Sequence, residues 1–141
     1  MKKPFDSCTL FKRILLVQNN PQVVAEVHDV LDLHFFEVTA VSSGPEAIQQ
    51  LLKNDFDAIV CDFTIPNLPA EMFFQATTRI RPRLANRFVA ITDAATSKST
   101  RSLGAVSIWK PIEPHILLEA IEGVLKKVES GTRTPQQYAA A

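Results

Sequence analysis

The stretch Ala58-Ile59-Val60-Cys61-Asp62-Phe63-Thr64-Ile65-Pro66 carries the clearest indication of architecture in this chain. Its apolar start is typical of a buried strand, because strands inside a parallel sheet are covered on both faces. Asp62 closes the apolar run, and open α/β sheets place their chemistry at the carboxyl ends of their strands. The stretch therefore predicts a central parallel strand that ends in an acidic side chain.

Two further polar residues follow apolar runs later in the chain. Thr92 closes one such run, and Lys110 follows another. A carboxylate, a hydroxyl and an ammonium at neighbouring strand ends are able to form one small polar site. The first apolar run, Ile14–Val17, ends instead in Gln18-Asn19-Asn20, which contains no acid.

Strands and helices alternate along the chain in the predicted order β-α, repeated five times. Right-handed crossovers then give a doubly wound, five-stranded parallel sheet with helices on both faces. The fourth predicted helix is short or irregular, because residues 93–103 are rich in Ser and Thr, which lower helix propensity. The predicted strands are Ile14–Val17, Glu37–Val41, Ala58–Cys61, Phe88–Thr92 and Val106–Trp109.

The predicted helices begin at recognisable caps. Asn20 before Pro21 and Ser43 before Gly44-Pro45-Glu46 are expected N-caps. A third helix ends before Pro82, and a long final helix opens near Pro114. The side chains expected on the apolar helix faces are Val23, Val27, Val30 and Leu31, then Ile48, Leu51 and Leu52, then Met72, Phe73, Ala76 and Ile80, and finally Ile116, Leu117, Ala120, Ile121, Val124, Leu125 and Val128. His34 shares the face of the first group, but all three histidines are expected at the surface or edge.

Length and composition are ordinary for one globular domain. The chain has 141 residues and a formal net charge of zero, which argues against a dedicated nucleic-acid binder. It has no apolar run of secretory or membrane-spanning type, so a cytoplasmic protein without membrane attachment is expected. Cys8 and Cys61 form no metal-binding spacing, and a disulfide between them is not expected. We expect a leader over 1–12, one domain over 13–128 and a flexible tail over 129–141.

From Arg13 to Val128 the chain resembles the receiver domain of bacterial two-component response regulators. The motifs that carry the resemblance are Ile14-Leu15-Leu16-Val17, Ser43-Gly44-x-Glu46-Ala47, Asp62-x-x-x-Pro66, Ile91-Thr92, Gly104-Ala105 and Lys110-Pro111. The resemblance implies a flavodoxin-like receiver fold and a signalling role in a phosphorelay, without enzymatic activity. It places Asp62 at the phosphoacceptor position, Thr92 and Lys110 beside it, and a cis bond between Lys110 and Pro111. The implied partner is a histidine kinase or another signalling protein.

The departures from the family pattern concern the metal site. Receiver domains end their first strand in an acid pair that holds Mg²⁺ with the phosphoacceptor Asp, whereas Gln18 and Asn19 stand there in this chain. An amide oxygen is able to ligate a metal but brings no charge, and Mg²⁺ prefers carboxylates. Mg²⁺ is therefore a possible but weak ligand of Asp62. Because phosphoryl transfer relies on the metal to neutralise charge, self-phosphorylation is expected to be slow or absent.

The region that relays the signal in the family is altered too. Asp93 follows Thr92, where the family prefers a small residue, and its charge either replaces a lost acid or opposes a phosphoryl group. Ser107 stands at the position of the switch aromatic, and Trp109 is the nearest large ring. The interval from Thr92 to Lys110 is about one helical turn shorter than in the family. Homodimerisation is possible, but these changes disfavour the usual dimer face.

Two functions from different classes remain open at this point. The first is a phosphorylatable receiver with a metal-poor pocket, and the second is a phosphorylation-independent pseudo-receiver that acts as a protein-interaction module. A phosphatase of the haloacid dehalogenase type is disfavoured, because it needs an Asp where Thr64 stands. A flavin-binding role is disfavoured by Gln18-Asn19-Asn20-Pro21, which is a poor phosphate-binding loop.

Overall fold

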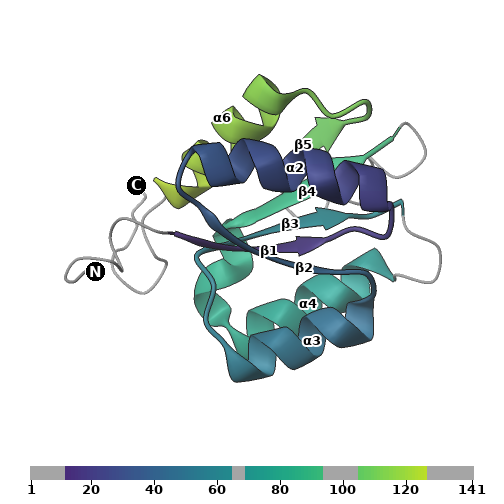
Figure 1. The fold of residues 1–141 in the computed structure, drawn as a ribbon. Helices are drawn as coiled ribbons and strands as arrows, with labels where there is room; N and C mark the ends of the chain where they lie inside the picture. Colours follow the sequence, from purple (N-terminus) through teal and green to yellow (C-terminus); the bar gives the residue numbers. More distant parts are fainter. Residues whose placement is uncertain (1–11, 65–68, 94–104, 127–141) are drawn as a thin grey trace, which may run out of the picture.

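A five-stranded parallel sheet forms the centre of the molecule in a computed structural model that describes residues 12–64, 69–93 and 105–126 (Figure 1). The strand order is β2-β1-β3-β4-β5, which confirms the predicted doubly wound sheet. The strands agree with the sequence prediction, except that β1 begins one residue earlier and β3 includes Asp62. They are β1 (Arg13–Val17), β2 (Glu37–Val41), β3 (Ala58–Asp62), β4 (Phe88–Thr92) and β5 (Val106–Trp109).

Helices cover both faces of the sheet, and each face has its own hydrophobic core (Figure 1). The helices α2 (Pro21–Leu33) and α6 (Pro114–Leu125) lie on one face, and α3 (Gly44–Lys53) and α4 (Ala70–Ile80) lie on the other. A 3₁₀ turn, η1 (Pro82–Asn86), connects α4 to β4. Every residue of β3 and β4 is buried, because each strand contributes alternate side chains to the two cores.

The predicted N-caps are confirmed. The Asn20 side chain accepts hydrogen bonds from the backbone N–H groups of Gln22 and Val23, and Ser43 accepts one from Glu46. The Glu46 carboxylate reaches back to the backbone N–H and hydroxyl of Ser42, at 2.9 Å each. These contacts fix where α2 and α3 begin relative to the ends of β1 and β2.

Several predicted core positions on the helices are wrong. Leu52 and Met72 are exposed, as is Ile116 on α6. Adjacent residues on a helix point about 100° apart, so only one member of the pairs Leu51–Leu52 and Met72–Phe73 faces the sheet. Ala47 and Thr77 fill the buried positions one turn away instead.

Other expectations fall outside the part of the chain that the structure describes. These are the leader apart from Lys12, Cys8, the loop residues 65–68, the fourth predicted helix (93–103) apart from Asp93, Val128 and the tail. Among the described residues, none of the helices has the length and apolar character needed to span a membrane.

Candidate functional site

The candidate site lies where the carboxyl ends of β1, β3 and β4 meet. Asp62 is the last residue of β3 and is only 1% exposed, and the β1 end beside it is followed by Gln18, which is 3% exposed. Parallel pairing aligns Val17 with Cys61 and Asp62 with Ile91, so the residues that follow β1 come next to Asp62. Lys110 follows β5, and its backbone N–H donates to the Thr92 carbonyl at 3.1 Å.

The Asp62 carboxylate is surrounded by donors from three segments. Its Oδ1 accepts from the Thr64 backbone N–H at 2.8 Å and from the Thr64 hydroxyl at 2.6 Å. Its Oδ2 accepts from Gln18 Nε2 at 2.8 Å and lies 3.1 Å from Lys110 Nζ. Lys110 Nζ also donates to Thr64 Oγ1 at 2.5 Å. Both oxygens of the carboxylate are therefore engaged by the protein itself.

The orientation of the Gln18 amide is fixed by the backbone that follows it. Gln18 Oε1 accepts from the backbone N–H groups of Asn19 at 3.0 Å and Asn20 at 3.1 Å. A flipped amide would set its NH₂ against these two donors and its oxygen against the Asp62 carboxylate. Gln18 consequently turns an N–H group toward Asp62, and its oxygen is occupied.

These contacts keep Asp62 ionised. Burial raises the pKa of the carboxyl, but the hydrogen bonds from Thr64, Gln18 and Lys110 together outweigh burial and hold the pKa below its ordinary value. The neighbouring Cys61 thiol is fully buried, and burial together with the Asp62 charge raises its pKa well above the ordinary value. The site thus contains a stabilised carboxylate beside a neutral thiol.

Of the three residues predicted at the strand ends, Asp62 and Lys110 lie together, whereas Thr92 makes a separate contact. Asp62 and Lys110 are in contact, as described above. Thr92 is fully buried, and its hydroxyl donates to the Ile108 carbonyl at 3.4 Å. Asp62 pairs with Ile91, so Thr92 lies one position further along β4. Because successive side chains of a strand point to opposite faces of the sheet, the Thr92 side chain lies on the face opposite to that of Asp62.

The remaining predicted residues lie around this centre. Asn19 is exposed, and Asp93 is partly buried directly after β4. On β5, Ser107 is paired with Ala90 and Trp109 with Thr92. Trp109 is 55% exposed. The peptide bond between Lys110 and Pro111 is cis.

Sequence reasoning missed the part that Thr64 plays in this site. From the sequence, Thr64 was informative only as the residue that stands where a phosphatase of the haloacid dehalogenase type has its second Asp. The available signal was local, since a hydroxyl residue two positions after an Asp often closes a small turn on its carboxylate. Here Thr64 donates two of the hydrogen bonds that Asp62 accepts, and its hydroxyl in turn accepts a hydrogen bond from Lys110 Nζ.

Comparison with known families assigns the chain. A family model described as the response regulator receiver domain matches residues 14–122. The chain belongs to this family. It is therefore a receiver domain of two-component signalling, and the fold and the resemblance predicted from the sequence are confirmed.

Individual relatives of this receiver domain are distant. Protein Rrf1 of Nitratidesulfovibrio vulgaris is 24% identical over 121 residues, which cover 85% of this chain and 87% of that protein. A CheY-like receiver domain from Methanospirillum hungatei has the same fold, with a TM-score of 0.72 and 23% identity over 82% of this chain and 94% of that one. The receiver domain of the sensor histidine kinase PA1611 from Pseudomonas aeruginosa has a TM-score of 0.70 and 23% identity, over 82% and 98% of the two chains.

The PA1611 receiver domain holds a magnesium ion in its active-site cleft, and the residues of the present chain do not fit that ion. Among the described residues, no group of three or more His, Cys, Asp or Glu side chains is placed to hold a metal. Mg²⁺ prefers carboxylate and water oxygens. Here the carboxylate of Asp62 already accepts four hydrogen bonds or ionic contacts, and Gln18 presents a donor to it.

Proposed function

We propose that this receiver domain is a phosphorylation-independent protein-interaction module of a signalling pathway. Asp62, at the phosphoacceptor position, is held as a structural anion. The observation that carries this proposal is the hydrogen bond from Gln18 Nε2 to Asp62 Oδ2 at 2.8 Å, in an orientation that the Asn19 and Asn20 N–H groups fix. This donor stands where the family has a metal-binding acid.

The charge of the pocket supports the same proposal. Phosphoryl transfer to a carboxylate depends on cations that neutralise the developing charge. In this pocket Lys110 already pairs with Asp62, so one ammonium would have to balance the whole phosphoryl group. Phosphorylation would also break the hydrogen bonds that Thr64 and Gln18 make to the carboxylate. The uncompensated charge and the broken hydrogen bonds both disfavour phosphorylated Asp62.

The second candidate function is phosphotransfer from a dedicated histidine kinase. It is favoured by the lowered pKa of Asp62, which keeps the nucleophile ionised, and by the contact with Lys110 at 3.1 Å. A kinase would then have to supply the charge compensation that the pocket lacks. Either function leaves the domain as a signalling module whose partner is another protein.

Intact mass after incubation with acetyl phosphate, with and without Mg²⁺, tests the proposal. We expect no phosphoryl adduct on the wild type under either condition. Gln18→Glu with Asn19→Asp restores both acids at constant side-chain size, and we expect this double variant to gain a Mg²⁺-dependent adduct. Adding Asp62→Ala should remove that adduct.

Two results would contradict the proposal. A Mg²⁺-dependent adduct on wild-type Asp62 would show that the pocket works without the acid pair. Equal behaviour of the wild type and the double variant would show that Gln18 and Asn19 do not control phosphorylation. The second candidate is tested separately, by incubation with a phosphorylated histidine kinase of the same organism and the same mass measurement.

A further inference from the structure

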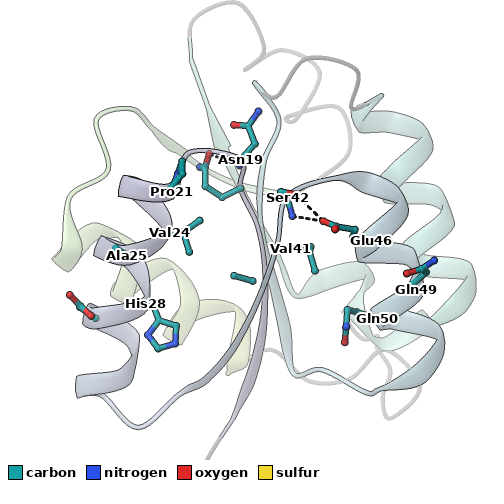
Figure 2. Close-up of a pocket in the computed structure, with 13 residues that line it drawn as sticks. Asn19, Pro21, Val24, Ala25, His28, Val41, Ser42, Glu46, Gln49 and Gln50 are labelled. Atoms are coloured by element: carbon teal, nitrogen blue, oxygen red, sulfur yellow. Dashed lines mark hydrogen bonds between the residues drawn. The ribbon is translucent and has the colours of Figure 1, made fainter.

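A groove lies beside the free edge of the sheet, between α2 and α3 (Figure 2). Its volume is about 840 Å³. The strand at its floor is β2, which is an edge strand because the sheet order ends with it. The groove is lined by Gln18 and Asn19, by residues of α2 that include His28 and Asp29, by Ala40–Ser42, and by Glu46, Gln49 and Gln50 of α3.

The backbone of β2 presents free hydrogen-bonding groups along this edge. The Glu37 N–H donates to the Lys12 carbonyl, and the Gln18 N–H donates to the Val41 carbonyl, so residues 37, 39 and 41 turn toward β1. In a parallel ladder the intervening residues turn the other way. The N–H and C=O groups of Val38 and Ala40 therefore point outward. Ala40 is exposed and small, so it leaves the backbone open to a close approach.

Glu46 ends the row of free backbone groups at the carboxyl end of β2. Its carboxylate accepts from the Ser42 backbone N–H and hydroxyl at 2.9 Å each, as Figure 2 shows by dashed lines. The Ser42 N–H is therefore not available to another chain. An added strand ends at this point, directly beside the carboxylate.

The side chains that line the groove carry negative charge, which favours a basic partner. Among the described residues that line it, Asp29 and Glu46 are acidic, and there is no lysine or arginine. A second copy of this chain, paired edge to edge, would bring these carboxylates against the same groups of its partner. Like charges brought together in an interface disfavour association. A basic segment is favoured instead.

We propose that the groove binds an extended segment of a partner protein, which adds to β2 as a further strand. Because its side chains alternate between the two faces of the sheet, it places one Lys or Arg against Asp29 of α2 and another against Glu46 of α3. Strand addition of this kind obtains affinity from main-chain hydrogen bonds and specificity from alternate side chains. The site goes beyond the proposed function and does not depend on whether Asp62 is phosphorylated. Gln18 lines one end of the groove and donates to Asp62, so an occupant also contacts the residue that holds the candidate site.

Selection of short random peptides displayed on phage, with the full chain immobilised, tests this site while the natural partner is unidentified. We expect the enriched peptides to alternate β-branched residues with polar residues and to carry Lys or Arg. On addition of such a synthetic peptide, the Val38 and Ala40 amides should gain protection from hydrogen exchange. Failure to enrich any peptide, or enrichment of acidic sequences, would overturn the proposal.

Matched variants locate the bound peptide. Asp29→Lys should weaken binding by about tenfold or more, whereas Asp32→Lys makes the same charge change one turn along α2, outside the groove, and should leave the affinity unchanged. Ala40→Pro removes one outward N–H and is tolerated at an edge strand, so it should abolish binding while the circular dichroism spectrum is kept. Equal effects of the two charge reversals would overturn the site. Undiminished binding to a folded Ala40→Pro variant would overturn strand addition.

Discussion

At the scale of single residues, Gln18 shows how an exchange of oxygen for NH₂ changes the chemistry of a pocket. A glutamate at this position would present a second carboxylate to Asp62 and would need a cation between them. The amide instead donates a hydrogen bond to Asp62 at 2.8 Å. Hydrogen bonds to a charged group contribute about 1.5–3 kcal/mol. The anion of Asp62 is therefore stabilised by the fold, with Thr64 and Lys110 as further donors.

Replacing Asp62 by Asn should destabilise the domain in a pH-dependent way. At neutral pH we expect a loss of about 1–3 kcal/mol, because the Asn NH₂ group would face donors. The folded pKa of Asp62 lies below its ordinary value of about 3.9, so the unfolded chain takes up the proton first as the pH falls. The contribution of ionised Asp62 to the free energy of unfolding is therefore fully present at pH values above the ordinary pKa. It is lost as the pH falls through the lowered pKa of the folded state.

Urea unfolding of the wild type and Asp62→Asn at a series of pH values measures this difference. The gap between the two free energies of unfolding should narrow in acid. A gap that stays constant or widens as the pH falls would mean that the hydrogen bonds do not hold Asp62 as an anion.

Part of this site could be predicted from the sequence. Asp62, Lys110 and the absence of an acid at Gln18 were visible as residue types at strand ends. The donor role of Gln18 was not visible, because it depends on the direction of the Asn19 and Asn20 N–H groups. These directions exist only once the chain turns from β1 into α2.

At the scale of elements, α2 ends in a way that its sequence does not favour. The Phe35 N–H donates to the Asp32 carbonyl and the Phe36 N–H to the Leu31 carbonyl, at 3.0 Å each. This is the hydrogen-bond pattern of a Schellman motif, with Phe36 and Leu31 buried in the same core. Phe35 consequently has a φ of 65°, at the position where glycine is usual. A bulky side chain in this region is strained.

Phe35→Gly should therefore stabilise the protein, by about 1 kcal/mol, because glycine adopts positive φ without a steric cost. Leu33→Gly is the matched control, since Leu33 is also exposed but lies in the last turn of α2 with helical geometry. Glycine there should destabilise by about 1 kcal/mol. Chemical denaturation of both variants gives the comparison, and a loss of stability in Phe35→Gly would show that the Phe35 ring contributes more than its backbone costs.

The ends of the helices were more predictable than their faces. Asn20 and Ser43 are recognisable because a cap depends on one side chain and the N–H groups next to it. The pairs Leu51–Leu52 and Met72–Phe73 are ambiguous, because either member could face the sheet. Packing decides between them, and it selects the residue that lies one turn from Ala47 in α3 and one turn from Thr77 in α4.

At the scale of the whole molecule, the two layers that cover the sheet are joined to it mainly by apolar packing, with a few long-range polar contacts. The alternation of strands and helices made the strand order predictable, since right-handed crossovers leave few alternatives. Polar contacts between distant segments were not predictable. Arg81, after α4, donates through Nε to the Leu51 carbonyl at 3.0 Å and through Nη2 to the Asn54 carbonyl at 3.1 Å. These carbonyls belong to the end of α3.

Arg81→Lys should destabilise the domain by about 1 kcal/mol. The planar guanidinium satisfies two carbonyls at once, whereas a lysine ammonium has no rigid fork with which to reach both. Arg79→Lys is the control, because Arg79 is exposed in the last turn of α4 and experiences the same change of side chain. Urea denaturation monitored by circular dichroism should show a lower midpoint for Arg81→Lys only. Equal midpoints for the two variants would mean that apolar contacts between α3 and α4 hold this layer together without the guanidinium.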